Sequence, residues 1–384
     1  MDFEFTDDLL LIQETARDFA KKELAPHAAR IDREESFPLE HLEKLAEIGF
    51  LGFLVPEKYG GAGLGNVALS LALEEINCAC ASTGVTLSVH NSLVAGLLVR
   101  HGSEEQKERF LPELVSGERL GAYAMTEPGH GSDAAGMETR AVREGDRYVL
   151  NGRKSWITSG AMAGLVVVFA TVDPSKRSRG VTAFLVDPES PGYVVGGHEK
   201  KLGLRGSQTV ELVFEDLEVD AGMRIGEEGE GFRIAMDSLN GGRIGIASQG
   251  VGIARACLES SRKYALEREQ FGESIANFQP IQWKLARMAM GIESARSLTW
   301  RAAWLRDRDR DHTRDAAMAK LLASEVANQA ATDAVQIHGG AGYCKDFPVE
   351  RHFRDAKVTE IYEGTSEIQH IVIAREVLSE YSSV

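Results

Sequence analysis

Apolar residues recur at helical spacing through the first part of the chain. Segments with this spacing cover residues 6–25, 39–48, 67–82 and 91–100, and a polar run at 103–109 leads into a more apolar one at 110–115. Thr6 stands where it can cap the first segment, Pro26 is expected to end it, and Gly49 ends the second. The pattern therefore predicts a helical domain over residues 1–120.

The pattern changes after residue 120. Short β-branched and aromatic runs at 147–152, 165–171, 180–187 and 209–214 are separated by Gly, Asn, Asp or Pro, which predicts an antiparallel sheet in a middle domain over 121–230. Long helical patterns then return at 232–266, 279–306, 313–337 and 366–381, and predict a four-helix bundle over 231–384. Because strands and helices do not alternate, the fold class is α+β rather than a Rossmann fold.

Composition narrows the class of protein. A hydrophobic content of 43% and a charged content of 26% are typical of a globular protein, and the net charge of -15 opposes nucleic-acid binding. Apolar stretches such as Leu165–Thr171 are too short to cross a membrane, so no membrane insertion is expected. The four cysteines form neither a CxxC pair nor a metal cluster with histidine, which predicts free thiols and no metal site. We expect a cytoplasmic protein of bacterial type, with a processed mitochondrial matrix form as the alternative.

Two local features raise a question about function. In "EIYEGTSEIQ", Ser366 and Gln369 have capping-box spacing, so a helix is expected to begin at Ser366 with one buried apolar face (Ile368, Ile371, Val372 and Leu378). Glu363 is not needed for that cap, and it is either a solvated loop acid or a functional group. Gly241-Gly242 is costly inside a helix, and either a close approach by a ligand or a bend would explain it. Rossmann, Walker A, nucleophile-elbow and zincin motifs are absent from the sequence.

Seven segments, taken in order, resemble motifs of the acyl-CoA dehydrogenase family of flavoproteins. They are "YAMTEPGHGSD", "NGRKSWITSG", "KLGLRGSQT", "GRIGIASQGVGIA", "REQFG", "QIHGGAGY" and "IYEGTSEIQ". The chain is most similar to the short-chain, butyryl-type members. The resemblance implies the helix–sheet–helix architecture, tightly bound FAD, a homotetramer, an acyl-CoA substrate and an electron-transferring flavoprotein as electron acceptor, as in fatty acid β-oxidation.

The resemblance also implies that Glu363 is the catalytic base. It would remove the α proton of the thioester while the β hydrogen leaves as hydride to flavin N5, giving a trans-2-enoyl-CoA. The thioester oxygen would be bonded by the backbone N–H of the base and by a flavin hydroxyl, with Gly364 allowing its approach. Relatives of isovaleryl type take the base from the helix near residue 242, but Asn240-Gly-Gly-Arg243 offers no acid. Glutaryl-type relatives carry an Arg where this chain has Gly84.

The other site residues carried over by the resemblance bind FAD or CoA. The alternatives are core packing for Trp156, a surface charge for Arg268 and a helix-terminal amide for Gln279. For Asn240 the family often has Asp, which puts that contact in question. The FAD residues are Tyr123, Met125, Thr126, Gly131, Ser132, Trp156, Ile157, Thr158, Arg268, Gln270, Phe271, Gln279, Thr365 and Glu367, with Gln336, Gly339 and Gly340 reaching the FAD of a neighbouring subunit; the substrate residues are Ser132, Asn240, Arg243 and Gly364.

The leading hypothesis is thus FAD-dependent α,β-dehydrogenation of a short straight-chain acyl-CoA. A dehydrogenase for a branched, alicyclic or dicarboxylic acyl-CoA is one alternative. An acyl-CoA oxidase is another, although the chain is shorter than typical oxidases. A non-catalytic family member would be expected to lose Glu363 or the flavin motifs, and both remain.

Overall fold

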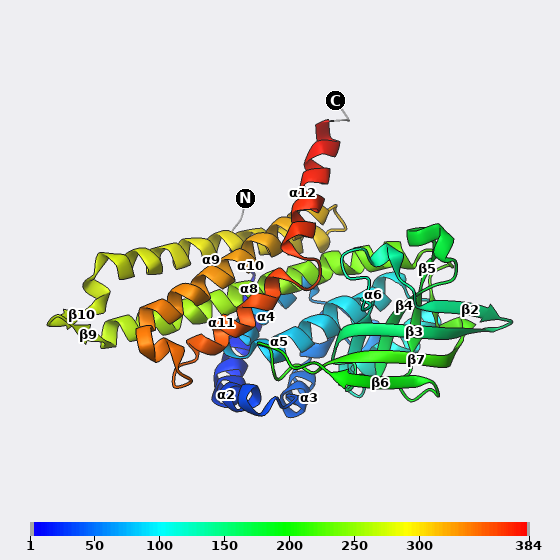
Figure 1. Ribbon diagram of the computed structural model, residues 1–384, viewed down its shortest axis with the longest axis horizontal. Coiled ribbons are helices and arrows are strands. Elements are labelled where there is room, and N and C mark those ends of the chain that lie inside the picture. The colour runs from blue at the N-terminus through cyan, green and yellow to red at the C-terminus, as the bar shows by residue number, and fades with distance from the viewer. Residues whose placement is uncertain (1–3, 382–384) are drawn as a thin grey trace.

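The computed structural model describes residues 4–381, in which a sheet stands between two helical regions, as the sequence predicts (Figure 1). Thr6 caps the first helix by accepting a hydrogen bond from the Leu9 N–H at 3.4 Å. Gly49 follows the third helix with a φ of 78°, a backbone conformation that glycine adopts at little cost. The N-terminal helices are α1 Asp7–Phe19, α2 Ala25–Glu34, α3 Leu39–Glu47, α4 Gly65–Ala79, α5 Ala81–Ser88, α6 Gly96–His101 and α7 Glu104–Ser116.

The prediction that Pro26 ends the first helix is wrong. A π-helical turn, Ala20–Leu24, joins α1 to α2, and Pro26 lies in the first turn of α2. Proline is tolerated there, because the first N–H groups of a helix have no partner within it.

Helix Ala81–His101 is the longest apolar helix of the N-terminal region. It contains a second π-helical turn, η4 (Val89–Ala95). By length and composition it could cross a membrane, and the sequence analysis overlooked it, but 94% of its most apolar window is buried inside the protein. It is therefore a core helix of this fold.

The middle region forms one mixed sheet in the order β6-β7-β3-β2-β4-β5-β8, with β1 paired to β4. Most pairs are antiparallel, but β1 runs parallel to β4, which departs from the predicted antiparallel sheet. The strands are β1 Gly121–Ala124, β2 Arg140–Glu144, β3 Arg147–Thr158, β4 Leu165–Thr171, β5 Val181–Val186, β6 Tyr193–His198, β7 Thr209–Asp220 and β8 Arg224–Ile225.

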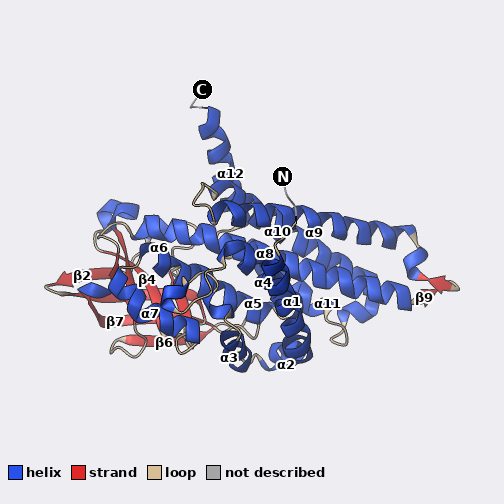
Figure 2. Cartoon of the chain, turned by 180° about the vertical axis from the view of Figure 1, so that it is seen from behind, coloured by secondary structure: helices blue, strands red, loops and turns tan. Residues whose placement is uncertain are grey.

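Strand β4 is buried on both faces. Leu165, Val167 and Phe169 join a core that includes residues of α6 and α7, which cross the sheet in Figure 2. The alternate residues Val166 and Val168 join a second core with side chains of β3 and β7. Since neighbouring side chains of a strand point to opposite faces, the continuous apolar run fits this position.

The C-terminal region is built on three long helices, which the sequence predicts within two residues at each end. They are α8 Gly231–Glu267, α9 Gln279–Arg306 and α10 Thr313–His338. A short hairpin, β9 Glu269–Gln270 with β10 Glu273–Ser274, joins α8 to α9. The shorter helix α11 Val349–Lys357, which the sequence analysis missed, also packs on this group, and His352 is among its buried side chains.

The last helix, α12 Ser366–Tyr381, packs on α10 at its start and then projects away from the body (Figure 1). Of its predicted buried face, Val372 is buried, but Ile371 and Leu378 are 60% and 67% exposed. The helix begins at Ser366 as predicted, yet Thr365 is the cap, because its hydroxyl accepts from the Ile368 N–H at 3.4 Å. Part of the apolar face of α12 is therefore left uncovered by residues 4–381.

Candidate active site

Glu363 lies in the short loop that enters α12. Its φ is 52°, in the left-handed region that is uncommon for a residue with a side chain, and Gly364 follows at 95°. Such backbone strain costs of order 1–3 kcal/mol per residue and persists where the surroundings hold it. The loop is therefore held in a backbone conformation that an ordinary solvent-exposed loop would not require.

The carboxyl group of Glu363 is buried, although the residue as a whole is half-buried. Its Oε2 atom is inaccessible to solvent and has no hydrogen-bond partner among the described residues. Burial raises the pKa of Glu363 to about 7, and the nearby Lys320 and Arg243 cations oppose that rise. Of the two readings, the solvated loop acid is therefore wrong for this carboxyl.

Two side chains hold the backbone of the loop. The Gly364 carbonyl accepts hydrogen bonds from the Lys320 Nζ at 2.7 Å and from the Gln369 Nε2 at 2.9 Å. Tyr362 donates its hydroxyl to Gln249 on α8, which ties the loop to the centre of the bundle. The backbone N–H of Glu363 donates to no acceptor within residues 4–381.

Gly242 faces the Glu363 carboxyl across the site. A Cβ at this position would lie 2.1 Å from the Glu363 Oε2 and 2.8 Å from the Leu93 Cδ2. Helix α8 runs unbroken through both glycines, so Gly242 marks a close approach rather than a helix break. The approaching group is the carboxylate of Glu363, and Leu93 forms a wall beside it.

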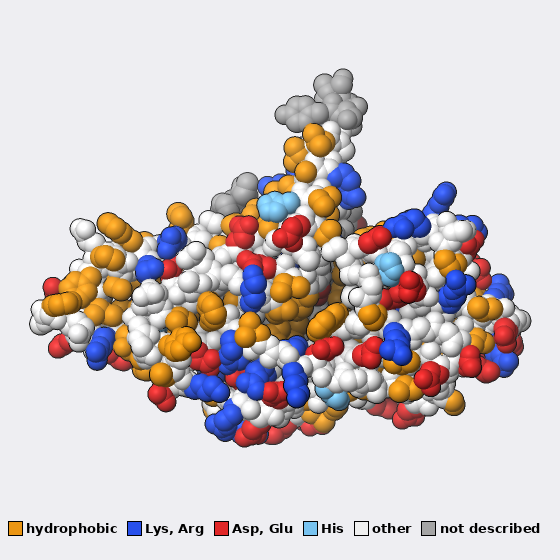
Figure 3. Space-filling view, in the orientation of Figure 1, with side chains coloured by type: hydrophobic (Ala, Val, Ile, Leu, Met, Phe, Trp, Pro, Cys, Tyr) orange, Lys and Arg blue, Asp and Glu red, His pale blue; other side chains and the backbone are white. Residues whose placement is uncertain are grey.

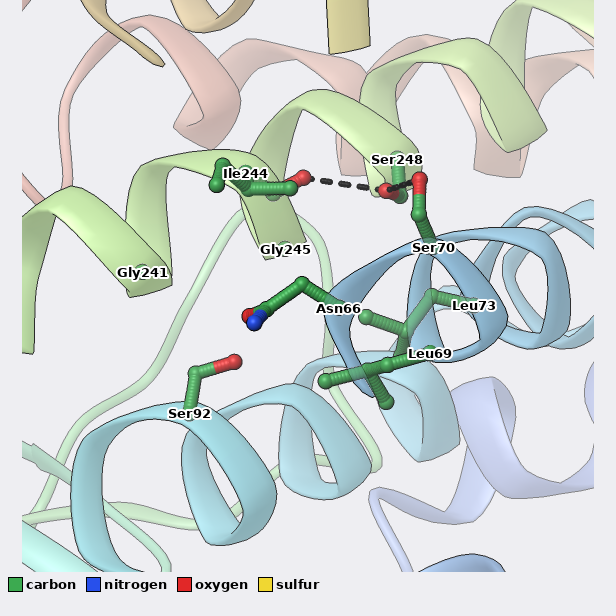
Figure 4. A pocket seen from close by; sticks show the side chains of 9 residues that line it. All are labelled: Asn66, Leu69, Ser70, Leu73, Ser92, Gly241, Ile244, Gly245 and Ser248. Carbon is green, nitrogen blue, oxygen red and sulfur yellow. Dashed lines mark hydrogen bonds between the residues drawn. The ribbon is translucent and has the colours of Figure 1, made fainter. Parts of the chain in front are cut away.

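A crevice too narrow to hold a water molecule lies next to this point, between α4, η4 and α8 (Figure 4). Gly241 and Gly245 form its α8 side, and the side chains of Asn66 and Ser92 point toward it. The Ser70 and Ser248 hydroxyls close one end with a 2.8 Å hydrogen bond. Three helices therefore approach closely behind the site, where glycine leaves room for them.

The predicted substrate residues on α8 lie close to the base. Arg243 is buried, donates to the Asn240 Oδ1 at 2.8 Å, and interacts electrostatically with Glu363. The Arg243 Nε is buried without a hydrogen-bond partner in the described part of the chain. Asn240 also donates to the Thr313 hydroxyl at 3.2 Å. Ser132 lies in the loop after β1 and is exposed.

Trp156, predicted to contact a flavin, is not a core residue. It lies in β3 with a φ of 62°, and its side chain is 59% exposed. Ile157, its neighbour, is buried in the core of the sheet, so its side chain is not free to contact a ligand. Nearby, the Ser159 hydroxyl and the Gln208 Oε1 are buried without partners among residues 4–381. Tyr123 lies on β1 at the Glu363 side, since its phenol group interacts electrostatically with that carboxylate.

Of the other predicted flavin residues, Met125, Thr126 and Gly131 follow β1, Thr158 ends β3, and Thr365 and Glu367 lie at the start of α12. The rest lie at the other end of the molecule. The hairpin that carries Gln270 and Phe271 is at the opposite end from the sheet (Figure 1). Gln336, Gly339 and Gly340 lie at the hairpin end, because the adjacent His338 stacks on Tyr264 of α8 at 4.3 Å. All of these are exposed, as are Arg268 and Gln279. Within one chain, the predicted flavin residues at the sheet end, such as Trp156, therefore lie far from those at the hairpin end, such as Phe271.

The sequence analysis missed Lys320 and Leu93 as site residues. Lys320 lies in an alanine-rich helical segment and Leu93 in an apolar one, so neither stands out by residue type or spacing. Only the packing of α10 and η4 against the Glu363 loop brings them there.

Comparisons with known proteins agree with this arrangement. Family models match in succession: the acyl-CoA dehydrogenase N-terminal domain at residues 6–118, the middle domain at 122–217 and the C-terminal domain at 229–378. The chain is 50% identical over 373 residues to the short-chain specific acyl-CoA dehydrogenase, mitochondrial, of Mus musculus, which covers 97% of this chain and 90% of the mouse protein.

Solved structures agree in fold. Butyryl-CoA dehydrogenase from Megasphaera elsdenii has a TM-score of 0.97 and 45% identity, over 98% of this chain and 100% of that one. A chain from a structure reported for work on the electron transferring flavoprotein of Acidaminococcus fermentans also has a TM-score of 0.97, with 46% identity over 98% of this chain and 100% of its own. The protein is therefore an oxidoreductase that belongs to the acyl-CoA dehydrogenase family.

Proposed function

We propose that this protein dehydrogenates short straight-chain acyl-CoA thioesters with FAD, and that Glu363 is the base that removes the α proton. The observation that carries the proposal is the buried Glu363 carboxyl, which has an unpartnered oxygen and a pKa raised to about 7. A general base works best when its pKa lies near the operating pH. An ordinary loop glutamate would be too weak a base for a thioester α C–H.

The backbone around Glu363 supplies the second requirement. The α proton becomes more acidic when a hydrogen-bond donor stabilises the charge that develops on the thioester oxygen. The Glu363 N–H is free to donate within the described chain, and Gly364 carries no side chain to block the approach. Lys320 and Gln369 hold the Gly364 carbonyl, so this donor keeps a fixed direction.

The residues on the sheet side fit an aromatic cofactor. Trp156 turns its ring outward, and the unpartnered Ser159 and Gln208 groups nearby are available to a polar ligand. Gly129 and Gly131 have no atom within 4 Å of a built Cβ, which leaves open space along the loop after β1. FAD, when bound, accepts the hydride that leaves Cβ, so that the product is a trans-2-enoyl-CoA.

We assign the other half of the cofactor site to residues of a second copy of the chain. Arg268, Gln270, Phe271, Gln279, Gln336, Gly339 and Gly340 lie far from Trp156 in one chain and are exposed. Phe271 is 96% exposed at the hairpin tip, and Trp283 and Met290 of α9 are 67% and 68% exposed. Such side chains are typical of a covered interface. We assign them to a homo-oligomer, a tetramer as in the family.

The substrate class rests on the relatives and on the wall beside the base. The mouse and Megasphaera proteins are named for short-chain acyl-CoA and butyryl-CoA. Leu93 limits the space next to Glu363, and Gly84 offers no charge to a second carboxylate. In Figure 3 the surface is hollowed below the base of α12, with hydrophobic side chains around the hollow, which suits an acyl chain. Asn240, Arg243 and Ser132 are assigned to the CoA part.

An electron-transferring flavoprotein is the proposed electron acceptor, in line with the Acidaminococcus structure. For the compartment, the bacterial cytoplasm stays the leading prediction and the mitochondrial matrix the alternative.

The substrate proposal is tested by the visible spectrum of the FAD-loaded protein under anaerobic conditions. Butyryl-CoA is expected to bleach the oxidised flavin faster than octanoyl-CoA, isovaleryl-CoA or glutaryl-CoA. If only another thioester bleaches the flavin, the proposed reaction stands but the proposed substrate class is wrong. A protein that stays colourless with FAD supplied would overturn the dehydrogenase itself.

A further inference from the structure

Lys320 of α10 is fully buried beside the Glu363 loop. Its side chain is 0% exposed, and its Nζ donates to the Gly364 carbonyl at 2.7 Å. This is its only hydrogen bond within the residues that the structure describes. An ammonium has three donors, so two of them have no protein acceptor.

Holding one carbonyl does not explain a buried charge. The Gln369 Nε2 already donates to the same Gly364 oxygen at 2.9 Å, and a neutral side chain could add a second bond. A buried ammonium is costly unless an opposite charge faces it. The acid with the strongest electrostatic effect on Lys320 is Glu363, whose Oε2 has no hydrogen-bond partner among residues 4–381.

We propose that Lys320 is a positioning residue of the reaction: its ammonium fixes the Gly364 carbonyl and, by its charge, keeps the unpartnered Glu363 carboxyl ionised and ready to accept the α proton. The proposal rests on the assignment of Glu363 as the base.

The charges around Glu363 come from several elements. Lys320 of α10 and Arg243 of α8 favour its ionised form, while burial opposes it. Tyr123 and Tyr362 also interact electrostatically with the carboxylate, and burial raises the pKa of both tyrosines. Glu360 and Glu367 act on Lys320 more weakly than Glu363 does. Burial lowers the pKa of Lys320 to about 8, so the lysine is still mainly charged at neutral pH.

Three substitutions separate the charge of Lys320 from its hydrogen bond. Lys320→Arg keeps the charge, Lys320→Gln keeps an N–H donor without charge, and Lys320→Met removes both. The measurement is the pH dependence of kcat/KM with butyryl-CoA, because its acid limb reports the protonation of the free base.

Loss of the charge is expected to move the acid limb to higher pH. With the cation gone, Glu363 binds its proton more tightly, so Lys320→Gln and Lys320→Met shift the midpoint upward by about one pH unit or more. Lys320→Arg keeps the midpoint of the wild type, even if its kcat falls because the longer side chain displaces the loop.

Lys357→Met is the matched control. Lys357 is 56% exposed and pairs with Glu360 near the same loop, so its charge is screened by water and its loss leaves the midpoint in place. A purely structural lysine would lower the melting temperature in all three Lys320 variants without moving the midpoint.

An unshifted acid limb in both neutral variants, with Glu363→Gln inactive, overturns the role of Lys320 and leaves the base intact. A shift in Lys320→Arg as large as in Lys320→Met also overturns the role of the charge. Retained activity in Glu363→Gln overturns the base and the lysine together. If Lys320→Met fails to fold, Lys320→Gln makes the same test.

Discussion

At the residue scale, one glutamate combines an unusual backbone with an unusual environment. Glu363 has a φ of 52° and a buried oxygen without a partner among the described residues. The surrounding Lys320, Gln369 and Tyr362 hold the loop in this shape. The free-energy cost of the strained backbone and of the desolvated carboxylate is therefore already met in the folded protein before substrate binds, as expected of a preorganised base.

Gly242→Ala is expected to lower kcat strongly. The new methyl group would lie 2.1 Å from the Glu363 Oε2, so the carboxylate has to move. A displacement of about 1 Å in a reacting group can cost on the order of 100-fold in rate. Rates of flavin reduction by butyryl-CoA check this, with flavin content measured alongside.

Gly245→Ala is the matched control for Gly242→Ala on the same helix. Its methyl group meets the Ser88 hydroxyl at 2.1 Å rather than the base. It is expected to lower stability and to reduce the rate much less. Equal losses of rate in the two variants would show that crowding of α8, and not displacement of Glu363, is responsible.

Sequence reasoning reaches part of this site. The motif resemblance predicts Glu363 and Gly364, whereas residue patterns alone leave Glu363 as a loop acid. Its burial depends on β1, α8 and α10, which are distant in sequence, so no local pattern shows it. For the same reason Lys320 and Leu93 are visible only in the folded chain.

At the element scale, periodicity predicts the long helices and the buried strands well. Segments such as α8, α10 and β4 have enough residues for a clear hydrophobic period, and the apolar residues of each are buried in the core. The short elements β1 and α11 are missed because a few residues carry little periodicity. The predicted apolar face of α12 is only partly covered by the described residues: Val372 is buried, whereas Ile371 and Leu378 are exposed.

A buried ion-pair network joins the two helical regions. Arg255 of α8 contacts the Glu74 Oε1 at 2.8 Å and also pairs with Glu75, both on α4. Arg296 of α9 contacts the same Glu74 oxygen at 2.7 Å. Both glutamates are buried, so each ionised carboxylate depends on these arginines.

Arg255→Met is therefore expected to lower the free energy of unfolding by about 3 kcal/mol, because it leaves buried carboxylates short of a partner. Chemical denaturation measures the change. Lys22→Met, which breaks the exposed Lys22–Asp18 pair, is the control and is expected to change the free energy of unfolding far less, because water screens that pair. A similar cost for both would mean that the network adds no more than a surface pair.

At the scale of the whole molecule, the residues proposed to bind the cofactor lie at two opposite ends of the folded chain. Trp156 and the loop after β1 lie at the sheet end, and Arg268 and Phe271 lie at the hairpin end (Figure 1). The separation explains why the hairpin residues are exposed in one chain. A second copy would complete the site and cover Phe271.

Phe271→Asp is expected to weaken assembly and FAD retention together. A charge at a buried contact between copies costs several kcal/mol unless it is paired. Light scattering after size exclusion gives the mass, and the visible spectrum gives the bound flavin. Leu202→Asp is the control, since Leu202 is 60% exposed but lies on the loop between β6 and β7 rather than on the hairpin. A Phe271→Asp protein with unchanged mass and flavin content would contradict the divided site.

The most direct test of Glu363 as the base is the anaerobic reduction of the flavin by butyryl-CoA in the wild type and in Glu363→Gln. Burial raises the pKa of Glu363 to about 7, and the base must be ionised, so the wild-type rate is expected to fall as the pH drops through about 7. Glu363→Gln is expected to keep its yellow colour and bind the thioester, yet not to bleach at any pH. Bleaching of Glu363→Gln at the wild-type rate would contradict the account.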